Sequence, residues 1–225
     1  MARPRVIDDE RLLAAAHEVL YEVGPATFTL QRAAERAGVS AATFIKRFGS
    51  KQELFLALNR RWVDSLLPTF AAAEAGRQTP LARLRAAALC GFDDLDSPGN
   101  TANELATLAL DLQDEQMSEL LARGWLIVEE HLRELAAEAI AAGEFGPDYT
   151  AEQVARILLA TCEGTRLTWC VRPVGSLVSR AEADIDAVLA ALAGRGPGAA
   201  ARGPGAAARG PGAAARSPGP GPADS

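Results

Sequence analysis

The sequence of 225 residues predicts an all-α fold. Apolar residues recur three and four positions apart, which is the period of an amphipathic helix. Alternating apolar and polar residues, which would indicate strands, are nearly absent. Aspartate, serine and threonine stand where helices would begin, and glycine or proline stands where they would end. At roughly 150 residues per domain, the length corresponds to one or two domains.

Four helices are predicted in the first 67 residues, over 8–24, 30–37, 41–48 and 54–67. Each of these helices is expected to begin at a residue whose side chain can accept a hydrogen bond from a free backbone N–H group. These residues are Asp8 or Asp9, Thr29, Ser40 and the capping box at 50–53. The residues expected to end three of these helices are Gly24-Pro25, Gly38 and Pro68.

Five more helices are predicted between residues 79 and 193. Thr79-Pro80 opens the first of them, because proline suits the first turn of a helix, and a second capping box at 150–153 opens the fourth. The bounds of the last four are about 101–113, 115–142, 151–171 and 179–193.

Composition excludes several classes of protein. With 48% hydrophobic and 23% charged residues, the chain has the balance of a soluble protein, and it has neither a transmembrane stretch nor a signal peptide. Its three cysteines contain no C-x-x-C pair, which argues against a disulfide framework and for a reducing compartment. Its two histidines are too few for a histidine-rich metal site. We therefore expect a cytoplasmic protein with no membrane contact, cofactor or metal.

Charge and repeats divide the chain further. Residues 1–61 carry more basic than acidic side chains, whereas residues 62–193 are strongly acidic. A basic segment attracts polyphosphate and an acidic segment repels it. From Arg195 the unit RGPGAAA occurs three times, and its glycines and prolines disfavour a helix. Residues 194–225 are therefore expected to form a disordered tail.

Residues 29–48 combine a short helix, a tight turn and another short helix. Ala34 is small where the two helices would approach each other, Gly38 tolerates a left-handed turn, and Phe44 would fill the angle between the helices. Such a helix-turn-helix places its second helix in the major groove of DNA. A plain helical corner uses the same residue types, so these three positions leave both interpretations open.

The surrounding sequence resembles the DNA-binding domain of TetR-family transcriptional regulators. The resemblance covers about residues 6–66, and the matching residues are Phe28-Thr29, Ala34, Ala37-Gly38-Val39-Ser40, Thr43, Phe48, Ser50-Lys51 and Leu54. The chain departs from the family pattern at Ala42, Ile45 and Arg47, where the family has Gly, Tyr and His. The resemblance implies a second domain, over 67–193, that binds an effector and forms a dimer. A weaker likeness at 143–145 and 164–169 supports this.

Ten residues are predicted to contact DNA. They are Thr29, Gln31, Arg32, Ser40, Ala41, Ala42, Thr43, Lys46, Arg47 and Lys51. Lys51, which matches the family position, would share a phosphate with the free N–H groups of the helix that it begins. Thr29 and Ser40 are either phosphate contacts or plain helix caps.

The second helix of the motif is expected to read the base sequence. Residues 41–43 and Lys46 would face the bases, and Arg47 would either read guanine or hold a phosphate. Residues 31–32 would touch the backbone or the groove edge. Arg3 and Arg5 would form an arm along the DNA or be merely disordered.

One such motif covers only a few base pairs, so we expect a homodimer on a near-palindromic operator, with recognition helices about 34–36 Å apart. The resemblance places the dimer interface on the last two helices. Apolar residues and a threonine at helical spacing there are Val154, Ile157, Leu158, Thr161, Ile185, Val188, Leu189 and Leu192. A plain core face is the alternative, and both hold if each helix has an inner and an outer side.

The acidic middle of the chain is the expected effector domain. Candidates for lining a pocket are Phe70, Leu84, Phe92, Leu108, Leu110, Trp125, Val128, Cys162, Arg166 and Trp169. Arg166 is the most informative, because a buried cation needs an anion or an aromatic ring. It would bind a carboxylate-bearing ligand or pair with Glu163 or Asp111.

These features together predict a sequence-specific DNA-binding regulator of transcription. It would be a nucleoid-associated, dimeric repressor that an unidentified small-molecule effector releases from its operator. The sequence contains no G-x-S-x-G, H-E-x-x-H or P-loop motif, so we expect no enzyme. The alternative is a helical protein-interaction module without DNA binding, which would leave Lys46-Arg47 and Ser50-Lys51 unexplained.

Overall fold

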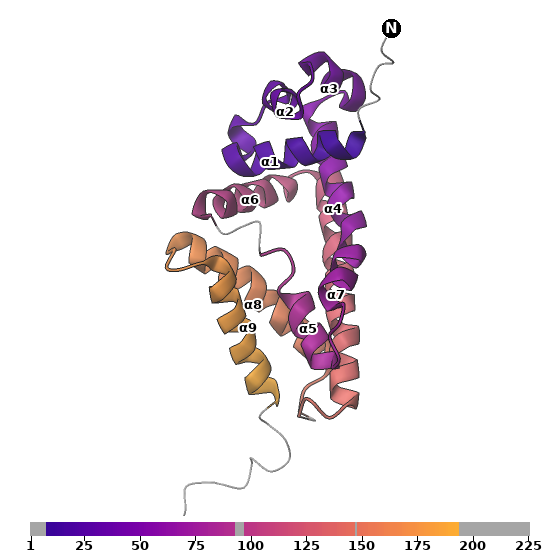
Figure 1. The fold of residues 1–225 in the computed structure, drawn as a ribbon, viewed down its shortest axis with the longest axis vertical. Coiled ribbons are helices and arrows are strands. Elements are labelled where there is room, and N and C mark those ends of the chain that lie inside the picture. The colour runs from indigo at the N-terminus through magenta and orange to yellow at the C-terminus, as the bar shows by residue number, and fades with distance from the viewer. Residues whose placement is uncertain (1–7, 93–96, 147, 194–225) are drawn as a thin grey trace, which may run out of the picture.

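In a computed structural model the described residues are 8–92, 97–146 and 148–193, and they form nine α-helices and no strand (Figure 1). The helices are α1 Asp9–Thr27, α2 Leu30–Ala37, α3 Ala41–Phe48, α4 Lys51–Glu74, α5 Pro80–Ala88, α6 Pro98–Asp111, α7 Glu115–Ala141, α8 Ala151–Val171 and α9 Leu177–Ala193. The all-α prediction is confirmed. No helix within the described ranges is long and apolar enough to cross a membrane. The predicted arm at Arg3 and Arg5 and the predicted tail at 194–225 lie outside the described residues.

The helices begin at the predicted capping residues. Side chains that accept a backbone N–H at a helix start belong to Asp8, Thr29, Ser40, Ser50, Thr79 and Thr150. The box at Thr150 is complete, because Gln153 N donates to Thr150 Oγ1 at 3.3 Å and Thr150 N donates to Gln153 Oε1 at 2.9 Å. At Ser50 only half of the predicted box forms, since Ser50 N donates to Phe48 O instead.

α4 passes through Pro68 and continues to Glu74, which corrects the prediction that Pro68 ends this helix. Proline removes one helical hydrogen bond. The carbonyl that loses its partner belongs to Asp64, which is exposed. Beyond the proline, Phe70 is only 4% exposed, and its packing outweighs the local cost.

Three further helix boundaries differ slightly from the prediction. Gly24 interrupts α1 as expected, with φ 74° and ψ 166°, but one more turn follows and runs to Thr27. α6 and α9 begin a little earlier than predicted, at Pro98 and Leu177. Proline favours the first turn of a helix, which explains the start of α6.

Two clusters of buried side chains form the interior. α1, α2, α3 and the first part of α4 enclose one cluster, which Met117 of α7 also enters. The rest of α4 encloses the second cluster together with α5, α7, α8 and α9. The predicted domain division at residue 66 therefore falls inside a continuous helix that contributes to both clusters. Figure 1 shows α2 and α3 at one end of the molecule, with α6 lying against α1.

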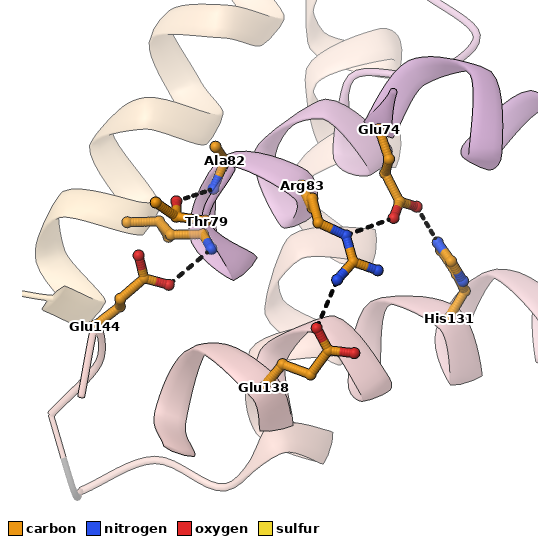
Figure 2. A network of polar contacts seen from close by, with 8 residues as sticks. Glu74, Thr79, Ala82, Arg83, His131, Glu138 and Glu144 are labelled. Carbon is orange, nitrogen blue, oxygen red and sulfur yellow. Dashed lines mark hydrogen bonds and ion pairs between the residues drawn. The ribbon is translucent and has the colours of Figure 1, made fainter. Parts of the chain in front are cut away.

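A polar network holds the C-terminal end of α4 against α5 and α7 (Figure 2). Arg83 donates to Glu74 at 2.9 Å and to Glu138 at 2.6 Å. His131 contacts the second carboxylate oxygen of Glu74, and its ring stacks on Phe70 with the centroids 4.5 Å apart. This end of α4 is thus anchored by two helices, α5 and α7, while its other end belongs to the N-terminal cluster.

Candidate nucleic-acid interface and ligand cavity

α2 and α3 are joined by the tight turn that the sequence predicts. Gly38 ends α2 with φ 70° and ψ 36°, the left-handed conformation in which a side chain is strained. Ala34 and Phe44 are both 0% exposed, as expected for a small residue at a helix contact and a ring that fills the angle between helices. The predicted structural roles of these three residues are confirmed.

One face of α3 is turned towards solvent. Its exposed residues are Ala42, Ile45, Lys46 and Arg47, and its half-buried residues are Ala41 and Thr43. Ile45 is apolar and yet 53% exposed, and no described residue covers it. The hydroxyl of Thr43 lies 3.0 Å from the Ser40 hydroxyl at the start of the helix. The face therefore offers methyl groups and cations to a partner.

The charged side chains of this region differ in their partners. Arg47 is paired with Asp9 of α1, and this carboxylate raises the pKa of the guanidinium. Lys46 and Arg32 are exposed and form no ion pair within the described residues. Gln31 donates to Glu35 at 2.7 Å on the outer face of α2. Lys46 and Arg32 are thus the more available cations.

Lys51 lies differently from what the sequence suggests. Its ammonium donates to Pro25 O at 2.6 Å and to Phe28 O at 3.2 Å, and it lies within 5.6 Å of the ring centroids of Phe28 and Phe55. Burial lowers the pKa of this side chain. The side chain connects the start of α4 to the segment between α1 and α2. Sequence reasoning missed this role because both acceptors are backbone carbonyls that are distant in the chain.

A cavity of about 580 Å³ lies between α1, α4, α5, α6, α7 and α8. The predicted residues that line it are Phe70, Leu108, Trp125, Val128, Cys162 and Arg166. Phe92 is fully buried beneath the Arg166 guanidinium, 4.7 Å from its ring centroid, rather than in the lining. Leu84 and Trp169 are core residues, and Leu110 is 45% exposed. The structure thus brings together only part of the predicted set.

Two acidic residues on α6, which the sequence did not mark as a pair, also line the cavity. Asp111 is 4% exposed, and its Oδ2 accepts from Asn59 Nδ2 at 3.2 Å. Burial raises the pKa of both Asp111 and Glu104; the Asn59 hydrogen bond opposes the shift at Asp111, and Arg166 opposes it at Glu104. Their spacing of seven residues on one helix was the signal available in the sequence.

The two predicted cavity residues on α8 have partners inside the protein. Arg166 donates to Glu163 at 3.0 Å, which is one of the two predicted ion pairs. Cys162 donates to Ala88 O at 3.3 Å, and burial raises the pKa of its thiol to about 12. This thiol is therefore not a reactive thiolate at neutral pH.

The N-terminal helices also match known proteins. Residues 12–58 match the family described as bacterial regulatory proteins, tetR family. The HTH-type transcriptional activator FasR of Mycolicibacterium smegmatis is 38% identical over 95 residues, which are 41% of this chain and 43% of FasR. The N-terminal helices of the chain are therefore similar to those of the tetR family. The matched residues contain α2 and α3, the two helices of the helix-turn-helix expected from the sequence.

Solved structures extend the likeness to the whole fold. A TetR transcription regulator from Haloarcula marismortui matches with a TM-score of 0.69 and 22% identity over 81% of this chain and 96% of its own. FadR of Bacillus subtilis, solved in complex with stearoyl-CoA, matches with a TM-score of 0.61 and 19% identity over 81% of this chain and 98% of its own. At these identities the likeness concerns the fold. All three relatives are named as regulators of transcription, and none is named as an enzyme.

α6 connects the cavity to α1, which in turn packs against α2. Asn103 Nδ2 donates to Tyr21 O of α1 at 2.6 Å. The same side chain packs against Gly24, where a Cβ would lie 2.5 Å from Asn103 Oδ1. The buried residues of α6 are Thr101 and Asp111, both polar, so the helix contributes no apolar side chain to either cluster. Sequence reasoning missed Asn103, since its partner is a backbone carbonyl of another helix.

The last two helices correct part of the predicted dimer surface. Five of its residues lie in the core of one subunit, namely Val154, Leu158, Ile185, Leu189 and Leu192. Ile157 is 36% exposed, and Thr161 and Val188 are half-buried. Leu167 of α8, which the prediction omitted, is 53% exposed. The outer side of α8 thus retains apolar surface.

Proposed function

We propose that the protein is a dimeric repressor that binds operator DNA through α3 and leaves it when a small molecule fills the cavity. The observation that carries the proposal is the exposed face of α3, held in position by buried Ala34 and Phe44 and covered by no described residue. A helix presented in this way fits the major groove of DNA. The likeness to the tetR family supports DNA, rather than protein, as the partner. Binding to chromosomal DNA would make the protein nucleoid-associated in the cytoplasm.

The α3 side chains divide by the part of DNA that they suit. The methyl groups of residues 41–43 and of Ile45 suit thymine methyl groups, and Lys46 suits the acceptors of guanine. Arg47 reaches guanine or a phosphate once it leaves Asp9, and both side chains are exposed enough for this exchange. Because Ile45 cannot donate to phosphate, the cations beside it carry more of the anchoring.

Phosphate contacts are proposed at the starts of α2 and α4. Thr29, Gln31 and Arg32 surround the first turn of α2, where free N–H groups attract an anion. Ser40 precedes the first turn of α3 in the same way and is proposed to contact phosphate there. At Lys51, the N–H groups of the first turn of α4 would hold the phosphate, while the ammonium fixes the loop that presents Thr29. The last contact differs from the sequence-based interpretation, in which the ammonium itself binds phosphate.

A homodimer would place two α3 helices on a near-palindromic site. The exposed Ile157 and Leu167 on α8 offer an apolar surface for pairing, together with the outer side of α9. Two-fold pairing uses the same surface on both copies. The test of this point is the mass in solution, with Leu167→Glu expected to give monomers.

Repression would follow from a bound dimer that obstructs transcription, and ligand binding would matter by favouring a dimer geometry that does not fit DNA. α6 provides the connection, since it lines the cavity and bonds to α1 through Asn103. The relative FasR is named as an activator, so a separate assay must decide whether this protein represses or activates transcription. In a reporter strain, deletion of the gene should raise expression from the bound promoter; a fall would show activation instead.

Selection of genomic fragments by the purified protein tests the proposal. We expect enrichment of a near-palindromic sequence, with affinity falling steeply as salt increases. Lys46→Ala should change the preferred sequence, Arg32→Ala should weaken binding to all sequences alike, and Arg77→Ala, a matched exposed cation distant from α3 in sequence, should do neither. If no fragment is preferred at low ionic strength, DNA binding is rejected and the protein-interaction module takes its place.

A further inference from the structure

The acidic side chains of α6 distinguish the cavity from an ordinary apolar pocket. Glu104 and Asp111 both line it and are seven residues apart, so they lie on the same helix face about 10 Å apart along the axis. Many carboxylates elsewhere in the described ranges are paired with arginine, as Glu74 is with Arg83. Glu104 and Asp111 have no such ion pair.

Asp111 is the stronger of the two observations. It is 4% exposed, and while Oδ2 accepts from Asn59, Oδ1 is fully buried and has no hydrogen-bond partner. A buried carboxylate oxygen without a donor is costly and rare in native proteins. Because Asp111 lines the cavity, a ligand that carries an N–H or O–H donor can satisfy this oxygen.

The Glu104 end of the cavity has an excess of negative charge. Glu104 Oε2 is buried without a partner, and the nearest described charges are Arg166 and Glu163. Arg166 forms an ion pair with Glu163 and stacks on Phe92, so this one cation faces two carboxylates and compensates Glu104 only in part; the buried Nε of Arg166 also has no hydrogen-bond partner among the described residues. This disfavours the carboxylate-bearing ligand suggested by the sequence, because such a ligand would add a further negative charge.

The walls between these two ends are aromatic and apolar. Rings that line the cavity belong to Tyr21, Phe55, Trp62, Phe70 and Trp125. The Trp62 ring lies so close to Gly124 of α7 that a Cβ there would overlap it. Aromatic faces attract cations as well as apolar groups. The cavity therefore combines aromatic walls with one buried acceptor at Asp111 and another at Glu104.

We propose that this cavity binds an elongated, largely apolar organic cation, with a positively charged nitrogen at Asp111 and a second donor at Glu104. Ligand binding in itself requires only the cavity. The regulatory consequence, release of DNA, rests on the function proposed above.

Four compounds with the same carbon chain test the charge and the spacing. The probe is 1,8-diaminooctane, whose nitrogens in the extended chain lie about as far apart as the two carboxylates, and the controls are octylamine, 1,8-octanediol and octanoate. Binding is measured by calorimetry and by the fluorescence of Trp62 and Trp125, without DNA. We expect the diamine to bind at least tenfold more tightly than octylamine, and the diol and octanoate to bind much more weakly. Equal or tighter binding of octanoate or the diol would overturn the proposal.

Isosteric variants assign the effect to the two carboxylates. Asp111→Asn and Glu104→Gln should each weaken diamine binding about tenfold or more, and thermal unfolding should show that both remain folded. Glu119→Gln, which removes the same charge from an exposed site on α7, should leave binding unchanged. Unchanged binding in both cavity variants would show that the diamine binds elsewhere and would overturn the proposal.

The two proposals fail separately. Selective DNA binding without diamine binding would reject the cation but keep the regulator. Diamine binding by a protein that prefers no DNA fragment would reject the regulator but keep the ligand class.

Discussion

Lys51 gives the sharpest test of how the DNA-binding helices are held. Lys51→Met keeps most of the side-chain volume but removes the hydrogen bonds to Pro25 O and Phe28 O. Each charge-assisted hydrogen bond contributes about 1.5–3 kcal/mol, and because Lys51 is only partly buried we take the low end, about 3 kcal/mol for both. For a domain of this size, a loss of that magnitude lowers Tm by roughly 6–12 °C.

Urea and thermal unfolding of Lys51→Met measure this loss, and Lys46→Met is the matched control. Lys46 is exposed and forms no ion pair in the described residues, so its variant should unfold like the parent protein. If the ammonium instead binds phosphate, Lys51→Met would keep its Tm but weaken binding to every DNA sequence, with the salt slope lower by about one. That result would refute the structural role of Lys51 and restore the sequence-based interpretation, in which its ammonium binds phosphate.

Three further changes have expected outcomes that follow from single contacts. Gly38→Val should lower the free energy of unfolding by about 1–2 kcal/mol in urea, because valine is strained at φ 70°. Asp9→Asn releases Arg47 from its ion pair, so non-specific DNA affinity should increase several-fold at low salt, and unchanged binding in filter assays would contradict this. Burial raises the pKa of Glu104 above its ordinary 4.5, so folding favours the neutral form more than the unfolded chain does, and the native protein loses stability as pH rises through the raised pKa. Glu104→Gln should therefore raise Tm at neutral pH, with the gain vanishing as pH falls below 4.5.

Local features of the fold were predictable, because the groups that decide them are neighbours in the chain. The caps Thr29 and Ser40 accept from N–H groups three residues away, and Gly38 ends its helix through its own φ. Pro68 was predicted wrongly by the same local reasoning. The helix continues past Pro68 because Phe70 and Glu74 contact α7. These contacts join residues that are distant in the sequence, so rules based on neighbouring residues cannot predict them.

The candidate site was predictable only on its outer face. Lys46 and Arg47 are exposed as the motif implies, and the helical period alone places Lys46 opposite Phe44. Lys51 and Asp111 depend instead on partners from other helices, a carbonyl in one case and Asn59 in the other. A sequence identifies side chains that can donate or accept, but only the packing of helices decides which of them are left without a partner.

The position of α6 explains how one ligand can act on both ends of the molecule. The helix contributes no apolar side chain to either buried cluster, and it packs closely against α1. A ligand that bonds to Asp111 would displace α6. Because Asn103 on the same helix bonds to Tyr21 O, that displacement would reach α1. α4 is anchored at its far end by Glu74, and nearer its start Asn59 bonds to Asp111 of α6. Asn103→Ala should therefore preserve DNA binding and cavity binding but weaken the effect of one on the other, a coupling that neither site measured alone would reveal.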